Sequence, residues 1–507
     1  MNACLFNECA WAEQEFGTVH SGDERRTERL VEVAAAMALK PGSSLPEAMG
    51  GAAELKAAYR LFGREELSHS SLLEGHCGRT ALACQQPGRY LLIGDTTDID
   101  YTAHPATVDL GHLGEHAARR GFLLHSTLAV AISEPQLTSS GNGLEMHHHR
   151  ELVGIFDQKL WKRPHSERLD KKAKKKDGWR GAIDRPRESD RWIETIEAMI
   201  VPPQAQWIYV ADRESDIYEC LQSARKGGVD FVIRAAYPRK LQQKEGDLFG
   251  AVAEAPVLGT TKLKLRPRAG RKARTATLEL RVCTVELSGP KRPGGRLEPI
   301  TVTVVEAREK GPARTKQKST KAKAGEKDEK SGKNNKAKED SQSEEPLHWV
   351  LLTSLPAGTL LEALEVVVIY RERWLIEDYH KALKSGTGVE RFQLESANAL
   401  ESVIGITAVI AARLLSLQLL AAKAPQTPLP ASYADPQALA ILEARFGRPK
   451  DGWTVAEYLR AIARLGGFLG RKSDGSPGWM TLWRGIRELS SALYLLNLLT
   501  AQKKCGQ

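Results

Sequence analysis

The chain has 507 residues, of which 41% are hydrophobic and 27% are charged. At about 150 residues per domain, this length predicts roughly three domains. The composition is that of a globular protein and excludes a wholly disordered chain. Lys and Arg number 73 against 63 Asp and Glu, a formal net charge of +10, which favours a polyanionic partner such as nucleic acid.

The N-terminal 80 residues have the pattern of a helical domain. One helix is predicted from Asp23 to a stop at Lys40-Pro41-Gly42, and a second begins at Ser44, three residues before the capping residue Glu47. Two pairs of cations four residues apart, Arg25 with Arg29 and Lys56 with Arg60, each share a helix face. On charge alone these faces are equally consistent with solvated surface.

Residues 81–395 change to short apolar runs bounded by turn residues, which is typical of buried strands in an α/β sheet. The predicted strands are 90–94, 122–132, 207–211, 231–235 and 349–353, with a helix at 214–225. Residues from about 240 to 307 are predicted to form an all-β insertion. The Lys-rich segment 308–346 lacks apolar periodicity and is predicted to be a disordered tether.

Residues 396–507 are predicted to form a helical module, with helices at 403–422, 454–465 and 480–499. The first of these approaches the length of a membrane span but carries Arg413 at its centre. A central Arg costs about 2.5–3.5 kcal/mol in an inserted helix, so a buried helix is the better interpretation. No membrane partner is expected.

Seven cysteines without a CxxC pair argue against a disulfide framework or a zinc ribbon. The first residues carry acids rather than the basic start of a signal peptide. A cytoplasmic location is therefore expected.

Three acidic residues stand out as candidates for chemistry. Asp95 and Asp212 each end a buried strand, where a carboxylate is costly unless a cation, solvent or hydrogen bonds compensate it. In the stretch 370–384, about 100° per residue places Tyr370, Arg373, Glu377 and Lys384 on one helix face. The structural alternatives are a helix cap or turn residue for each aspartate and an Arg373–Glu377 ion pair worth about 0.3–0.5 kcal/mol. The chemical interpretation is a two-metal phosphoryl-transfer site with neighbouring cations on phosphate.

The spacing Tyr-x2-Arg-x3-Glu-x6-Lys resembles the signature of bacterial insertion-sequence transposases of the IS-four family, and the whole chain is most similar to the Tn-five branch. Further motifs of that resemblance occur in order along the chain: Gly22-Asp-Glu-Arg-Arg-Thr-Glu-Arg-Leu30, Ala57-Ala-Tyr-Arg-Leu-Phe62, Gly94-Asp-Thr-Thr97, Asp212-Arg-Glu-Ser-Asp-Ile217, Phe231-Val-Ile-Arg234, Trp349-Val-Leu-Leu-Thr-Ser354, Leu465-Gly-Gly467, Trp479 and Trp483.

The resemblance implies an RNase H-like mixed-sheet catalytic core with an all-β insertion, flanked by an N-terminal helical DNA-binding domain and a C-terminal helical dimerisation domain. It implies a metal-binding catalytic triad of Asp95, Asp212 and Glu377, with two Mg²⁺ or Mn²⁺ ions. It also implies contacts with the DNA end from a second group of residues: Tyr370, Arg373, Lys384, Arg234 and Trp349.

The implied activity is cut-and-paste transposition through a hairpin intermediate. The partners implied are double-stranded DNA, both transposon ends and target, and a second copy of the chain in the DNA-bound synaptic complex. Terminal-repeat recognition is expected from the N-terminal helices, with Arg25, Arg26, Lys56 and Arg60 as candidate contacts. The implied location is the cytoplasm of a prokaryote, at the nucleoid.

Two other functions stay open on the sequence: a DNA-binding regulator or inactive relative that pairs ends without cutting, and another RNase H-like nuclease such as a junction resolvase. The chain also departs from the family pattern in the stretch 134–186. This stretch contains His147-His148-His149 and a lysine run at 171–176. The histidines do not share a helix face, so a surface loop is predicted there rather than a metal site.

Overall fold

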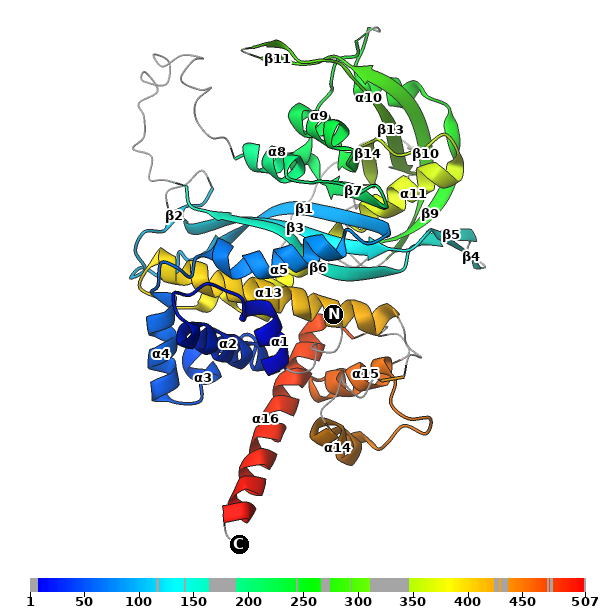
Figure 1. Cartoon of the computed structure of the whole chain (residues 1–507). Coiled ribbons are helices and arrows are strands. Elements are labelled where there is room, and N and C mark those ends of the chain that lie inside the picture. The colour runs from blue at the N-terminus through cyan, green and yellow to red at the C-terminus, as the bar shows by residue number, and fades with distance from the viewer. Residues whose placement is uncertain are drawn as a thin grey trace, which may run out of the picture.

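The computed structural model describes residues 8–114, 118–140, 143–163, 188–242, 245–265, 274–292, 294–310, 346–423, 428–429, 436–471, 474 and 477–505. In these residues one sheet of ten strands runs in the order β2-β3-β1-β7-β8-β14-β13-β10-β9, with β6 paired to β3 (Figure 1). The strands are β1 (Gly88–Asp100), β2 (Gly111–His112), β3 (Arg120–Ile132), β6 (Arg150–Trp161), β7 (Ala205–Ala211), β8 (Asp230–Arg234), β9 (Val257–Leu265), β10 (Arg274–Leu287), β13 (Ile300–Glu309) and β14 (His348–Thr353). All five predicted strands are present.

Both faces of the central strands β1, β3, β7 and β8 are buried, which explains why these strands read as continuous apolar runs. Along β1, Leu91 and Ile93 face one core cluster, whereas Tyr90 and Leu92 face the other. Helices α8 (Asp190–Glu197) and α9 (Tyr218–Gly227) lie on one side of the sheet, and α5 (His69–Ala83) and α13 (Ala397–Lys423) lie on the other (Figure 1). The described part of the chain thus has the mixed-sheet core with helices that was expected of an RNase H-like protein.

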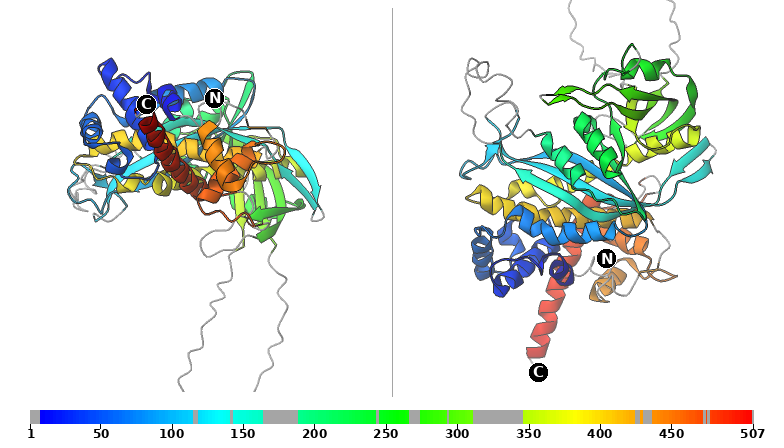
Figure 2. Two further views of the ribbon diagram at one scale, coloured as in Figure 1. Left: turned by 90° about the horizontal axis from the view of Figure 1, so that it is seen from below. Right: turned by 45° about the horizontal axis from the view of Figure 1, so that its top comes forward.

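The predicted β insertion is not a separate body. Strands β9, β10 and β13 continue the central sheet beyond β14 by antiparallel pairing. Figure 2 shows these green strands curling away from the rest of the sheet at one end. Helices α10 (Leu248–Glu254) and α11 (Leu360–Arg371) pack against them. Sequence alternation identified the strands but could not identify their neighbours, which lie far away in the chain.

The helix predicted at 214–225 begins later than expected. Arg213–Ser215 form a 3₁₀ turn, and α9 starts at Tyr218. The interruption has a local cause, since the carboxylate of Asp216 is buried and accepts hydrogen bonds from the backbone N–H groups of Ala236 and Tyr237 and from Arg239. These bonds tie the start of α9 to the loop after β8.

The N-terminal helices follow the sequence signals closely. Helix α2 (Glu24–Leu39) begins after Asp23, whose side chain accepts a hydrogen bond from the Arg26 N–H, and ends before Lys40. Ser44 likewise caps the short helix α3 (Leu45–Ala48). The remaining helices are α1 (Glu8–Phe16), α4 (Ala52–Phe62) and α5, and α5 crosses the boundary predicted at residue 80 to pack on β6.

The helix α13 is the axis on which the modules meet. It packs against α5 and β6 of the core, α2 and α4 of the N-terminal helices, and α15 (Val455–Leu465) and α16 (Trp479–Cys505) of the C-terminal ones. Its segment Ala397–Leu420 is apolar enough to cross a membrane, but 83% of its most apolar window is buried within the protein, as the sequence predicted. Arg413 is buried there, with its guanidinium 4.9 Å from the centre of the Trp11 ring and 3.6 Å from Glu8.

The C-terminal helices α14 (Pro436–Phe446), α15 and α16 lie on the same side of the sheet as the N-terminal helices (Figures 1 and 2). Thr454 and Glu457 form the capping box of α15. Cys9, Cys77, Cys84 and Cys220 are not in disulfide bonds. The lysine run 171–176 and residues 311–345 of the predicted tether lie outside the described residues, whereas residues 308 and 309 belong to β13.

Gly42, in the turn between α2 and α3, marks a close approach of all three modules. Its φ is +74°, and a Cβ there would lie 2.7 Å from the Gly386 carbonyl oxygen and 2.6 Å from the Trp483 ring of α16. We expect Gly42→Ala to lower the free energy of unfolding by about 1–3 kcal/mol, measured by chemical denaturation. Gly50→Ala is the matched control, because a Cβ at Gly50 meets nothing within 4 Å. Equal stability of the two variants would contradict the close approach.

Candidate active site

The register of three adjacent strands brings the two aspartates together. Strands β1 and β7 are parallel with Gly94 opposite Ala211, so Asp95 and Asp212 come next on neighbouring strands. Strands β7 and β8 are also parallel, with Ala211 opposite Ile233, so Arg234 follows in the same row. Neighbouring strands are about 4.8 Å apart, which sets the scale of this row. Residues separated by 117 positions in the chain are thereby made neighbours.

Strand alternation also decides which face these side chains share. Ile93, Val210 and Val232 precede the row by two residues and belong to the core cluster that includes the helix α12 (Trp374–Lys381). Because side chains two residues apart point to one face, Asp95, Asp212 and Arg234 point toward α12 as well. The sheet thus presents two acids and one base to the helix that carries Glu377.

The helix predicted over 370–384 is divided into three parts. Helix α11 ends at Arg371, α12 begins at Trp374, and a π-helical turn, η2, follows from Ala382 to Gly386. Glu372 and Arg373 keep right-handed helical backbone angles at the junction, so the chain bends without a loop. The predicted common face therefore survives for Arg373 and Glu377 but not as one continuous helix to Lys384.

Glu372 anchors this junction to the sheet. Its side chain is 3% exposed and pairs with Arg150 at the start of β6 and with Arg371 at 3.2 Å. These cations hold the pKa of Glu372 below its usual value, against the opposing effect of burial. A buried charge that is paired in this way is costly to separate from its partners, so the neighbouring Arg373 backbone is held in place.

Arg373 lies between two of the three predicted metal ligands. Its guanidinium Nη2 is 2.5 Å from Glu377 Oε1, and its Nη1 is 3.4 Å from Asp95 Oδ2. The predicted i,i+4 ion pair is therefore present, with a second carboxylate on the same cation. Within the described residues, no three acidic, His or Cys side chains already form a group that could hold a metal ion. Asp95 and Glu377 thus lie on either side of one guanidinium, and Asp212 is next to Asp95 in the strand register.

The Asp95 carboxylate lies in an environment that disfavours its negative charge. Burial and the nearby Asp212 raise the pKa of Asp95 to about 7, although Arg373 and the Thr96 N–H lower it. The Thr96 N–H donates to Asp95 Oδ1 at 2.8 Å, and the Glu214 N–H donates to Asp212 Oδ1 at 2.8 Å. A carboxylate whose pKa is raised by another carboxylate is a common mark of a functional site.

The donor set fits a divalent cation of the Mg²⁺ class. Such ions prefer carboxylate oxygens, and all three candidate ligands are carboxylates. The mutual repulsion of Asp95 and Asp212, and the exposure of Glu377 (44% of its side chain), leave charge that a cation would neutralise. The residues present are therefore suited to the group that the sequence implied.

Tyr370, Arg234 and Trp349 form a wall beside the triad. The Arg234 guanidinium forms a hydrogen bond with Tyr370, and its Nη2 donates to the His348 carbonyl oxygen at 3.0 Å. Burial lowers the pKa of Arg234 and raises the pKa of Tyr370. Trp349 packs edge-on against Tyr370 at 5.0 Å and is 6% exposed. It lies in an aromatic cluster rather than on an open platform.

The other candidate residues lie apart from this centre. The Lys384 ammonium, in η2, is 3.8 Å from Glu390. Arg26 is half-buried and pairs with Asp23 at 3.1 Å, which gives it a part in capping α2. The remaining three candidates, Arg25 on α2 and Lys56 and Arg60 on α4, are exposed.

Three neighbours of the site escaped the sequence analysis. The Glu214 carboxylate contributes to the raised pKa of Asp95, and burial and Asp212 raise the pKa of Glu214 itself. The positive charge of Arg213 contributes to the lowered pKa of Arg234. Trp374 packs edge-on against Trp349, with 6.4 Å between the ring centres. Glu214 and Arg213 stand inside the Asp212 motif, so their place next to Asp212 was available as a signal. The contact of Trp374 with Trp349 on β14 had no corresponding signal in the sequence.

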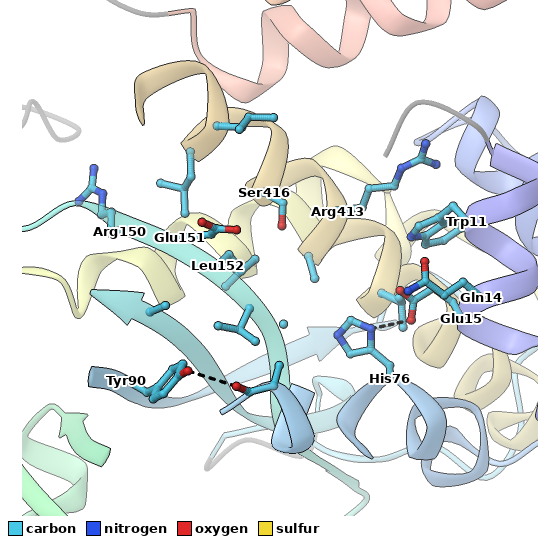
Figure 3. Close-up of a pocket in the computed structure, with 18 of the residues that line it drawn as sticks. Trp11, Gln14, Glu15, His76, Tyr90, Arg150, Glu151, Leu152, Arg413 and Ser416 are labelled. Carbon is cyan, nitrogen blue, oxygen red and sulfur yellow. Dashed lines mark hydrogen bonds and ion pairs between the residues drawn. The ribbon is translucent and has the colours of Figure 1, made fainter. Parts of the chain in front are cut away.

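A cavity of about 340 Å³ lies elsewhere, among α1, α5, β6 and α13 (Figure 3). Its polar groups are mutually satisfied, since His76 Nδ1 bonds Glu15 at 2.7 Å and the His76 Nε2 accepts the Ile155 N–H. None of the triad residues lines it. The cavity is a junction between modules rather than the site of the carboxylate chemistry.

Three family models match successive parts of the chain. Residues 8–67 match the transposase DNA-binding family, residues 188–413 the transposase DDE domain, and residues 409–496 the transposase Tn5 dimerisation domain. The DDE match contains Asp212 and Glu377 but begins after Asp95. The place of Asp95 therefore depends on the β1–β7 register.

The raised pKa of Asp95 predicts a pH-dependent stability. Between pH 3.8, the pKa of an ordinary Asp, and about pH 7, the folded protein keeps the Asp95 proton whereas the unfolded chain loses it. The free energy of unfolding therefore falls as pH rises through this interval. Each unit is worth about 1.4 kcal/mol. Without divalent ions, Asp95→Asn should therefore melt higher than the wild type, with a difference that grows up to about pH 7 and is constant above it. Thermal melts across pH in chelator measure this, and a difference independent of pH would contradict it.

Proposed function

The chain belongs to the IS-four family of DDE transposases, with the DNA-binding and Tn5-type dimerisation domains of that family, and on that premise we propose that it carries out cut-and-paste transposition. It is a DNA transposase that binds DNA and forms dimers. The proposal extends to its substrate, the terminal inverted repeats of a transposable element, and to a prokaryotic, nucleoid-associated location.

The observation that carries the proposal is the position of the Arg373 guanidinium between Asp95 and Glu377, with Asp212 next to Asp95 in the β1–β7 register. We assign the catalytic role to these three carboxylates, with two Mg²⁺ or Mn²⁺ ions as cofactors. Such ions, when bound, polarise a phosphodiester and favour ionisation of an attacking water. A protein retained only to bind DNA would not need these three acids, of which Asp95 is buried at an electrostatic cost.

Arg373 has two successive partners in this proposal. In the free protein it offsets the charge of Asp95 and Glu377. Metal ions held by these carboxylates would supply the same positive charge, which would leave the guanidinium available to a DNA phosphate. Arg234, held by the His348 carbonyl oxygen, and the Tyr370 hydroxyl supply further donors in the same wall. Arg is suited to this task because its planar donors match phosphate oxygens.

The proposed reaction is a series of phosphoryl transfers at one site. Water cleaves one strand at the element's end, and the freed 3′ hydroxyl attacks the opposite strand, which releases flanking DNA and leaves a hairpin. A second water opens the hairpin, and the 3′ hydroxyl then attacks target DNA. Each step exchanges one phosphodiester oxygen for another, so no external energy source is needed. Trp349 is assigned to the unpaired base of the hairpin and Lys384 to the end phosphates.

A cleavage assay on supercoiled donor DNA with Mg²⁺ tests the catalytic assignment. We expect Asp95→Asn, Asp212→Asn and Glu377→Gln each to lower strand cleavage by about 10³-fold or more, because each removes a metal ligand, while DNA binding is kept. Asp378→Asn is the matched control on the same helix and should retain activity. Wild-type protein that binds ends without nicking them would instead identify a DNA-binding regulator. Cleavage of branched DNA that is independent of any terminal repeat would identify another kind of nuclease.

The exposed cations of α4 provide a separate test of end recognition. If Lys56 and Arg60 contact phosphates, replacing either with Ala weakens binding and lowers the slope of log K against log salt by about 1. Lys226→Ala, an exposed cation on α9, is the control. Fluorescence titration of an end duplex across salt concentrations measures the slopes. Unchanged slopes in both α4 variants would remove this helix from the DNA interface.

A further inference from the structure

The three consecutive histidines at 147–149 do not form a simple surface loop. His147 ends the strand β5 (Gly143–His147), which pairs with β4 (Gln136–Ser140), and β6 starts directly after His149. The side chains alternate as in a strand: Met146 and His148 are buried, His147 is half-buried and His149 is exposed. The first and third imidazoles therefore share one face, which the sequence interpretation as a loop did not anticipate.

The backbone of this segment is held firmly. Ser133 N–H donates to the His149 carbonyl oxygen at 2.9 Å, and the His149 N–H donates to the Ser133 hydroxyl at 3.0 Å. The buried His148 contributes a third bond from Nδ1 to the Ser133 carbonyl oxygen at 2.8 Å. His148 is thus committed to structure, and His147 and His149 are presented on a fixed backbone.

The rings of His147 and His149 are 6.1 Å apart between centroids and nearly perpendicular, at 84°. Among the described residues, neither imidazole has a hydrogen-bond or ion-pair partner. Imidazole nitrogens bind Zn²⁺ at about 2.0–2.1 Å, so a shared ion draws the ring nitrogens closer than the centroids. Rotation about the side-chain torsions of these outward-facing rings achieves this without backbone movement.

Both rings line a cavity of about 390 Å³, which leaves room for water on an ion's remaining coordination positions. The cationic side chains around this cavity are each paired with an acid, which reduces their electrostatic repulsion of a bound metal ion. Lys264 is 3.0 Å from Glu145, and Arg150 and Arg371 pair with the buried Glu372. Trp374 forms another part of the wall.

We propose that His147 and His149 bind one first-row transition-metal ion of the Cu²⁺, Ni²⁺ or Zn²⁺ class in this cavity. Two neutral imidazoles suit these ions and not Mg²⁺, which prefers oxygen ligands. The site is therefore chemically distinct from the carboxylates of Asp95, Asp212 and Glu377. With only two protein ligands, it remains open on one side, and water fills the other positions.

Calorimetric titration of the full-length protein with Ni²⁺, in buffer containing excess Mg²⁺, tests the proposal. The expected result is one saturable site in the wild type that is lost in His147→Asn and in His149→Asn. It should persist in His20→Asn, which removes an exposed histidine elsewhere, and in Asp95→Asn, which alters the carboxylate site. Circular dichroism establishes that each variant is folded.

Cu²⁺ gives a second readout through electron paramagnetic resonance. Imidazole ligation produces nitrogen hyperfine structure, which should weaken in each single variant and disappear from the one-equivalent complex in the double variant. Saturable Ni²⁺ binding that both single variants retain, or that Asp95→Asn abolishes, would place the ion elsewhere and overturn the proposal. So would a wild-type protein with no saturable site.

Discussion

The repulsion between the carboxylates of Asp95, within β1, and Asp212, directly after the parallel strand β7, is the constraint on which the rest of this site depends. The β1–β7 register makes Asp95 and Asp212 neighbours, and burial prevents water from screening them fully. The fold meets this cost in part, with the backbone N–H of Thr96 and the guanidinium of Arg373. The pKa of Asp95 nevertheless stays near 7, so the compensation is incomplete without a further cation.

The position of Arg373 in turn depends on a second buried charge. Glu372 turns away from the active site and pairs with Arg150 and Arg371, while the next side chain reaches Asp95 and Glu377. The bend between α11 and α12 permits these two consecutive residues to serve opposite sides of the helix. Consecutive residues of an unbroken helix would also point in different directions. What is specific to this junction is the ion pair of Glu372 with Arg150, which fixes it to β6 of the sheet. Orientation of the guanidinium is therefore a property of the sheet as much as of the helix.

Sequence patterns were sufficient for features with local causes. The helix start at Asp23, the cap at Ser44, the apolar strands and the Arg373–Glu377 pair all follow from spacing of a few residues, and the structure has them. The patterns failed where the cause is distant. The interruption at Asp216 depends on backbone groups after β8, and the β insertion joins the sheet by the pairing of β13 with β14.

The candidate site falls between these cases. The sequence identified Asp95 and Asp212 as costly carboxylates at strand ends, but β1 continues past Asp95 to Asp100. Only the register shows that the two aspartates are neighbours in a row with Arg234. The 3.6-residue period correctly placed Arg373 near Glu377, whereas the π-helical turn at 382–386 changes the phase that the same period assigned to Lys384. Periodicity reports the face of one element, and it carries no information about a change of helix type inside that element.

The packing of α13 connects the site to both flanking modules. The same helix underlies α12 and η2, receives α2 and α4 on one part of its surface, and receives α15 and α16 on another. Arg413 adds a specific link, because its buried guanidinium is satisfied by Trp11 and Glu8 of α1. Removing α1 would leave that charge without these partners inside the protein, at a cost of several kcal/mol. The DNA-binding helices are therefore part of the support of the catalytic core, and a change in their packing is transmitted to the helix beneath Glu377 through direct contacts.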